Sequence, residues 1–307
     1  MSYSKKRIDY NNTWPNHSIE LTAEQNFKNA LDDSNLDQIF KPIHLPLIED
    51  VQFQRLLSFK IDIYEQLPLR PDIAFDLAWR TFEAYTTYFA KSNRWTVSKS
   101  WKILNKSCED IFKNQINDET VLKSVFEELL NLIPLQATEF LIKRIFETTS
   151  IAIKSQQTQI KERVKDSLGT DLYDAIESKY GGTNFNATNQ RNAALLLKTI
   201  ITGEEVNILG QKFKLDIEKI SKFLINGLLY TYRNERFHGD AFSPFKSSKA
   251  DMKTYSVSYY YLITTYFFIA CLIYRNYDSI INITEVGEKL NDNNSRFKLI
   301  FENFLKK

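Results

Sequence analysis

The feature that most restricts the fold of this chain is a long uncharged segment in its last quarter. No Asp, Glu, Lys or Arg occurs between Thr254 and Tyr274, and Lys253 and Arg275 flank the segment. Its length matches a membrane-spanning helix. Its composition does not, because the first half is rich in tyrosine, serine and threonine hydroxyls that lipid cannot pair. We expect a helix packed at the centre of the protein, with a membrane span as the weaker alternative.

The rest of the composition indicates a folded protein with a large core. The chain has 307 residues, of which 43% are hydrophobic and 14% aromatic, and this excludes a disordered chain. Its 40 Lys and Arg against 38 Asp and Glu give a net charge of +2. This balance disfavours a protein that coats nucleic acid, but it is compatible with a local basic groove.

Cysteine usage and the N-terminus both favour a reducing compartment. Cys108 and Cys271 lie in unrelated contexts, with neither a metal-ligand spacing nor a disulfide framework. We expect both to be small core residues. No apolar run follows the basic residues near the N-terminus, so the sequence predicts no secretory signal and a cytoplasmic location.

Helical periodicity dominates the chain and predicts an all-α protein. We expect helices at about 22–31, 47–66, 72–92, 96–115, 119–132, 135–155, 158–178, 190–202, 216–236, 251–277 and 294–305. Thr22 with Gln25 forms a capping-box pattern, and Asn189 or Thr188 is the expected cap of the helix at 190–202. Residues 204–215 are compatible with a small hairpin. Residues 154–167, polar nearly all round, predict an exposed helix.

The segment TYRNERFHGD (231–240) contains the clearest candidate chemistry. On a regular helix, five residues rotate the chain by about 500°, so Arg233 and His238 would point roughly 140° apart. If the helix instead ends near Arg236 and Gly239 turns the chain, the two side chains can converge. Asn234 lies four residues before His238 and is its neighbour on a helix.

An arginine and a histidine suit the cleavage of RNA. Arginine binds phosphate oxygens bidentately, and histidine transfers protons near neutral pH. RNA supplies its own nucleophile, the 2′-hydroxyl, so such a pair doubled across a two-fold axis needs no metal. The sequence contains no metal-ligand spacing, glycine-rich phosphate loop or nucleophile elbow, and it therefore predicts no metal and no cofactor.

The stretch RNERFH resembles the R-x4–6-H motif of the HEPN superfamily, and the 72–92 segment, with AWRTFEAY, is similar to the first helix of several HEPN families. The resemblance implies an all-α bundle. It also implies a metal-independent endoribonuclease of a toxin–antitoxin or antiphage system, active as a homodimer whose two motifs build one cleft.

The resemblance implies a role for each motif residue. Arg233 would bind and polarise the scissile phosphate, and His238 would transfer a proton or contact the phosphate. Asn234 would orient His238 or the substrate, and Glu83 would assist from the 72–92 helix. Further substrate contacts are expected from Arg236, Lys246 and Lys249.

The implied partners are RNA, single-stranded or transfer RNA, a second copy of the chain, and an antitoxin or defence partner, with no membrane. The implied organisation is an N-terminal extension or helical lobe (1–70), a HEPN-like domain with inserted helices (71–285) and a C-terminal helix (286–307). Two alternatives stay open. One is a non-catalytic HEPN-like module that binds nucleic acid or a protein, and the other is a helical scaffold in which the motif is only a polar helix end.

Overall fold

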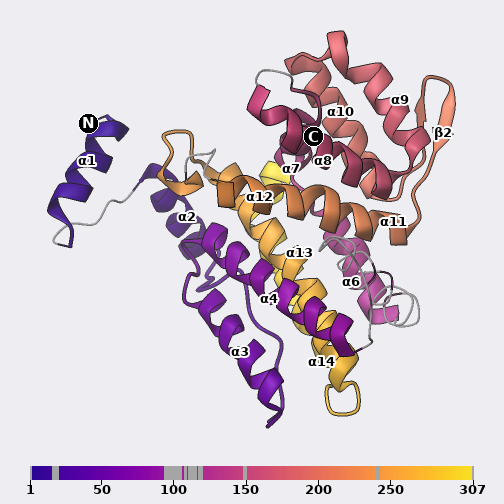
Figure 1. The fold of residues 1–307 in the computed structure, drawn as a ribbon. Helices are drawn as coiled ribbons and strands as arrows, with labels where there is room; N and C mark the ends of the chain where they lie inside the picture. Colours follow the sequence, from indigo (N-terminus) through magenta and orange to yellow (C-terminus); the bar gives the residue numbers. More distant parts are fainter. Residues whose placement is uncertain are drawn as a thin grey trace.

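The computed structural model describes residues 2–15, 21–92, 106, 109, 116, 120–147, 151–238 and 243–305, without the side chains of 89, 92, 151–156 and 238. Apart from one short hairpin, the regular elements of these residues are helical (Figure 1), which confirms the all-α class. The helix expected at 96–115 lies almost entirely outside this description, as do Cys108 and Gly239.

The uncharged segment forms the central helix, α13 (Met252–Tyr277), and Figure 1 shows it passing through the middle of the molecule. It is long and apolar enough to cross a membrane, yet 94% of its most apolar window is buried inside the protein. Asp251 begins it with a capping box, because its carboxylate accepts from the Thr254 amide and the Thr254 hydroxyl accepts from the Asp251 amide. The expected central packing is confirmed.

Buried tyrosine hydroxyls of α13 find partners in distant backbone. The Tyr259 hydroxyl donates to the Pro68 carbonyl at 2.7 Å, and the Tyr266 hydroxyl accepts from the Ile43 amide at 2.9 Å. Such hydrogen bonds remove the cost of burying a polar group. Contacts with protein thus explain part of the polar half of this segment, because the Ser256 and Tyr261 hydroxyls have no hydrogen-bond partner among the described groups.

The N-terminal region contains α1 (Tyr3–Thr13), α2 (Thr22–Asp33) and α3 (Val51–Tyr64). Phe27 of α2 stacks on Tyr255 of α13 at 4.0 Å, and α3 lies along α4 (Pro71–Ser92). The Thr22 cap was wrong, because the N-cap is Leu21 and makes no side-chain bond. The start of α3 is later than expected, because the Asp50 carboxylate accepts from the Phe53 amide at 2.7 Å.

A second group of helices follows later in the chain. It contains α6 (Thr120–Asn131), α7 (Leu135–Phe146), α8 (Ile151–Leu168), α9 (Thr170–Tyr180), the 3-10 turn η2 (Gly182–Asn184) and α10 (Ala187–Ile201). The predicted helices at 135–155 and 158–178 were divided wrongly. The chain breaks after Phe146 and again at Gly169, whose φ of 88° favours glycine.

The remaining boundaries follow local hydrogen bonds. Asn186 caps α10 by accepting from the Asn189 amide at 2.9 Å, so the expected caps Thr188 and Asn189 were wrong. The hairpin at 204–215 is confirmed as β1 (Val206–Ile208) paired antiparallel with β2 (Gln211–Phe213). The last helix, α14 (Ile283–Leu305), begins earlier than expected. The domain limits at 70 and 285 stay predictions.

The helix expected at 216–236 is one rod in three parts. These are α11 (Ile217–Lys222), the π-helical turn η3 (Phe223–Leu229) and α12 (Tyr230–His238). The rod thus continues two residues beyond Arg236. After it, the 3-10 turn η4 (Pro244–Lys246) leads into α13.

The expectation of an exposed helix at 154–167 was wrong, because its polar residues satisfy backbone carbonyls elsewhere. Arg163 is only 3% exposed, and its Nε donates to the Asn226 carbonyl of η3 at 3.1 Å. The Gln157 amide donates to the Ile145 and Glu147 carbonyls at 2.9 and 2.7 Å and so completes the end of α7. Polar composition here reflects the pairing of buried backbone groups rather than solvent exposure.

Candidate nucleic-acid interface

The motif helix α12 runs along α4 in the opposite direction. Near its start, the Tyr230 ring meets Trp79 at 5.8 Å, and two residues before its end Arg236 reaches Asp72 and Asp76. Between them, Tyr232 packs on Phe75 at 5.2 Å. Aromatic contacts thus hold the helix that carries the motif against α4.

Arg236 forms a partly buried ion-pair cluster with two aspartates. Its Nε donates to both Asp76 oxygens at 2.8 and 3.0 Å, and its Nη2 lies 2.6 Å from Asp76 and 3.1 Å from Asp72. Burial acts to lower the pKa of Arg236, but the bonds to Asp76 and its charge raise the pKa by more. Nε and Nη2 hold the guanidinium as a structural cation, which leaves only Nη1 for the predicted substrate contact.

Arg233 has a different environment from Arg236. Its Nη1 donates to the Asn234 side-chain oxygen at 3.1 Å, and its Nη2 lies 3.6 Å from a Glu83 oxygen. The guanidinium stacks over Phe237, at 4.3 Å from the ring centroid, and its buried Nε has no hydrogen-bond partner among the described groups. The structure therefore brings Arg233, Asn234 and Glu83 together and leaves Arg233 with unused donor capacity.

His238 is the last residue of α12, and its side chain lies outside the described part of the chain. Convergence of His238 with Arg233 within one chain required the helix to end near Arg236. Because the helix continues to His238, the backbone directs these two positions roughly 140° apart. His238 instead follows Asn234 by about one turn, on the same side of α12.

Lys246 and Lys249 follow α12 on the segment of η4. The backbone carbonyl of Lys246 accepts from Arg7 at 2.9 Å. On the same segment, Ser243 and Pro244 line a cavity of about 260 Å³ together with Arg144, Glu235 and Arg236. The predicted lysines thus accompany Arg236 rather than Arg233.

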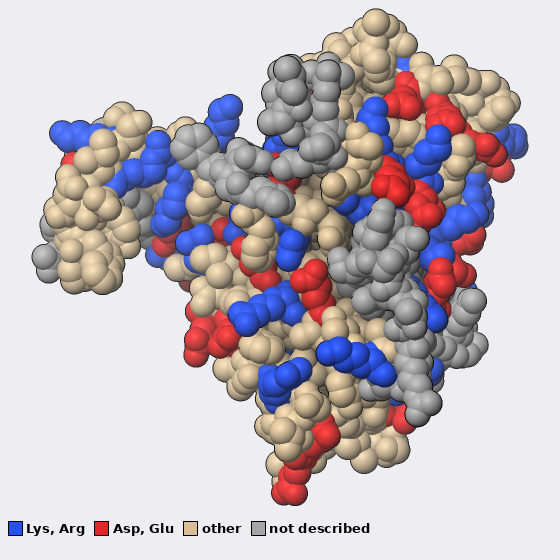
Figure 2. All heavy atoms as spheres, in the orientation of Figure 1, with Lys and Arg blue, Asp and Glu red and all other residues tan. Residues whose placement is uncertain are grey.

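A basic hollow that the sequence analysis did not find lies between α3 and α4, and Glu83 connects it with Arg233. It measures about 450 Å³, and its lining is polar: Gln52, Arg55, Arg80, Glu83, Ala84, Thr87, Tyr88 and Lys91. Arg55, Arg80 and Lys91 are exposed, and Glu83 is the one acid among the described residues that line it. Figure 2 shows Lys and Arg side chains gathered on the face over α3 and α4.

The α4 part of this hollow had a readable signal. Residues 80, 84, 87 and 91 recur at the spacing of one helix face, next to Glu83. The sequence contained no signal for the contribution of α3, because Arg55 reaches the hollow only through the packing of α3 on α4. Three cations beside one carboxylate form a site that favours anions, phosphate in particular.

The described residues contain no group of three or more His, Cys, Asp or Glu side chains that could hold a metal ion. Searches against protein-family models, curated proteins and solved structures found no match to this chain. The function is therefore inferred from the site itself.

Proposed function

We propose that this protein is a metal-independent endoribonuclease of HEPN type, active as a cytoplasmic homodimer in a toxin–antitoxin or antiphage system. The observation that carries the proposal is the environment of Arg233. This arginine is only partly neutralised by Glu83, has a buried Nε without a partner, and lies next to the basic hollow. Arg236, by contrast, directs its Nε and Nη2 to two aspartates, one of them fully buried.

The reaction follows from the chemistry of RNA. A base removes the proton of a 2′-hydroxyl, whose oxygen attacks the adjacent phosphorus, and the bond to the 5′-oxygen breaks as that oxygen takes up a proton. The products are a 2′,3′-cyclic phosphate and a 5′-hydroxyl. Arg233 stabilises the charge that develops on the phosphate, and His238 serves in proton transfer.

The proposed homodimer would bring an arginine and a histidine together, which a single chain does not do. On the uninterrupted α12, Arg233 and His238 of the same chain point apart. A two-fold axis beside α12 would place Arg233 of one copy opposite His238 of the other. Arg55, Arg80 and Lys91 would then hold the strand on either side of the cleft.

The continuous helix also supports a second candidate, an RNA-binding module without catalysis. In this case the hollow and Arg233 bind phosphates, and His238 has no role in binding. The two candidates share the binding surface and differ only in whether His238 acts on bound RNA.

The test is cleavage of end-labelled single-stranded RNA by the full chain in excess EDTA. We expect cleavage with cyclic phosphate ends, and a loss of at least about 100-fold for Arg233→Ala and for His238→Ala. Arg191→Ala, which removes an exposed arginine of α10, is the matched control and should cleave like the wild type.

Cleavage that survives Arg233→Ala would refute the proposal. Binding of RNA without cleavage, unchanged in His238→Ala, would establish the second candidate. The toxin setting predicts that expression of the wild type, and not of Arg233→Ala, arrests bacterial growth.

A further inference from the structure

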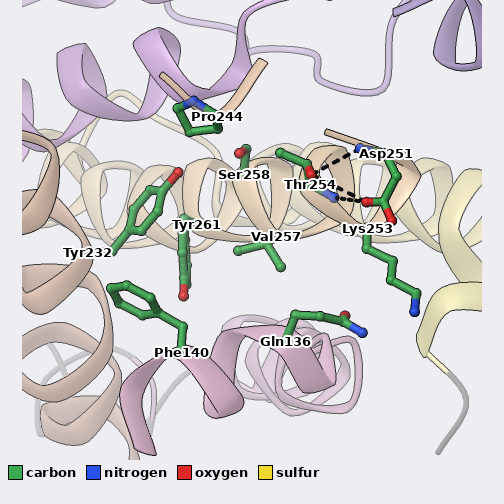
Figure 3. A pocket seen from close by; sticks show the side chains of 10 residues that line it. All are labelled: Gln136, Phe140, Tyr232, Pro244, Asp251, Lys253, Thr254, Val257, Ser258 and Tyr261. Carbon is green, nitrogen blue, oxygen red and sulfur yellow. Dashed lines mark hydrogen bonds between the residues drawn. The ribbon is translucent and has the colours of Figure 1, made fainter. Parts of the chain in front are cut away.

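A third cavity adjoins α12 at Tyr232, and Arg233 does not line it. It measures about 310 Å³ and opens between α7, the first turns of α13 and η4 (Figure 3). Its lining is Gln136, Phe140, Tyr232, Pro244, Asp251, Lys253, Thr254, Val257, Ser258 and Tyr261. This volume is at the lower end of the range of about 300–1,000 Å³ typical of small-molecule sites.

Three aromatic rings stand together at one end of this cavity. Tyr232 and Tyr261 lie 4.3 Å apart between ring centroids, and Phe140 meets Tyr232 edge-on at 5.8 Å. Each ring comes from a different helix, and all three are grouped in Figure 3. Such a wall favours a flat, aromatic ligand, because rings gain from stacking and edge-on contacts.

Two buried polar atoms lining the cavity have no hydrogen-bond partner among the described groups. They are the hydroxyl of Tyr261, a residue that is 0% exposed, and the Oε1 of Gln136. Leaving such a group unpaired costs about 1–3 kcal/mol, and native proteins do so rarely. A ligand with both a donor and an acceptor on its edge would pair these atoms.

The mouth of the cavity carries one lysine and one carboxylate. Lys253 is exposed, and in Figure 3 its ammonium group extends along the same side as the Gln136 amide. The Asp251 carboxylate at the rim is occupied by the cap of α13, where it accepts from the Thr254 amide at 3.1 Å. An anion attached to the bound ring would meet Lys253.

From these contacts we propose that the cavity binds a nucleobase. The ring would lie against Phe140, Tyr232 and Tyr261, and its edge would pair with the Gln136 amide and the Tyr261 hydroxyl. Glutamine amides pair bidentately with base edges, and aromatic side chains are the usual stacking platform for bases. Lys253 would contact the attached phosphate. The base can belong to a free nucleotide or to an RNA strand, which present the same chemistry.

The test is calorimetric titration of the full chain with AMP, GMP, CMP and UMP, and separately with a 2′-O-methyl oligonucleotide that the protein cannot cleave. We expect at least one of these ligands to bind. Tyr261→Phe and Gln136→Leu should each weaken that binding about tenfold, the effect of one lost hydrogen bond. Lys253→Gln should weaken a nucleotide more than its nucleoside.

Tyr260→Phe is the matched control. Tyr260 is a neighbouring buried tyrosine of α13 that does not line the cavity, so its loss of a hydroxyl should leave binding unchanged. Binding of a mononucleotide identifies a free nucleotide as the ligand, and binding of the oligonucleotide alone identifies a base in a strand. No binding of any ligand, or equal weakening by Tyr260→Phe and Tyr261→Phe, would overturn the inference.

The site is independent of the proposed nuclease. Arg233→Ala should leave mononucleotide binding unchanged, because Arg233 does not line this cavity. Failure of RNA cleavage and failure of base binding can therefore be told apart.

Discussion

At the scale of single residues, Lys60 of α3 is the most costly group in the core. Its side chain is fully buried, its ammonium nitrogen lies 5.2 Å from the Tyr266 ring centroid, and it has no hydrogen-bond partner among the described groups. Burial lowers the pKa of Lys60 from 10.5 to about 7. A cation–π contact alone does not compensate for the lost hydration of an ammonium group.

This pKa predicts how the stability of the protein depends on pH. Between pH 7 and 10.5 the unfolded state binds more protons at Lys60 than the folded state, so the free energy of unfolding rises with pH in this window. Lys60→Met should remove this rise and raise the stability at pH 7 by several kcal/mol. Urea denaturation at pH 7 and pH 9.5 measures both effects. Equal pH slopes for the wild type and Lys60→Met would contradict the prediction, and Lys298→Met, an exposed change, is the control.

The two arginines of the motif differ in how far their contacts could be predicted from the sequence. The pattern RNERFH and the likeness of AWRTFEAY to a first helix were sufficient to relate Arg233 to Glu83, which lie 3.6 Å apart. Nothing near Arg236 distinguished it from Arg233. Its partners Asp72 and Asp76 are more than 150 residues away in the sequence, and only the packing of α12 on α4 makes it structural.

At the scale of elements, periodicity predicted most helices but not their interruptions. Gly169, followed by Thr170 and Asp171, is a readable stop and start signal, and the apolar period was wrongly continued across it. The π-helical turn η3 had no local signal. The Asn226 carbonyl within it is bonded by Arg163, which belongs to α8 and meets η3 only in the folded chain.

The contact between Arg163 and η3 predicts a large effect of one substitution. Arg163→Met removes the hydrogen bond to Asn226 and the stacking on Tyr230, which lies 4.7 Å from the guanidinium. The carbonyl then loses a bond from a charged donor, and we expect a loss of about 1–3 kcal/mol in the free energy of unfolding. Urea denaturation measures it. Arg191→Met, at an exposed position of α10, should change stability by less than about 0.5 kcal/mol, and an equally small effect of Arg163→Met would contradict the prediction.

At the scale of the whole molecule, the net charge of +2 is a sum over the chain and does not describe any one part of the surface. The all-α class and the central position of α13 followed from the sequence, because long apolar periods determine both. The basic hollow could not be predicted from the sequence, because it forms only where α3 packs on α4. The net charge of the chain therefore does not indicate the local electrostatic potential that a phosphate would meet at the hollow.

The hollow predicts the salt dependence of RNA binding. Replacing Arg55, Arg80 and Lys91 together by Gln should weaken binding of a 2′-O-methyl oligonucleotide. It should also reduce the slope of log affinity against log salt by about 2, as expected for three lost phosphate contacts. The control replaces Lys179, Lys212 and Lys214, exposed on α9 and the hairpin segment, with the same change in net charge. An equal effect of both triple variants would show that only net charge matters.

The rod that ends in α12 is anchored at two separate places. Arg163 bonds it at η3, and Asp72 with Asp76 binds Arg236 two residues before its end. Two anchors restrict the movement of the backbone that carries Arg233. The entropy of ordering this backbone is then lost during folding, so under the proposed function less of it opposes the binding of a phosphate.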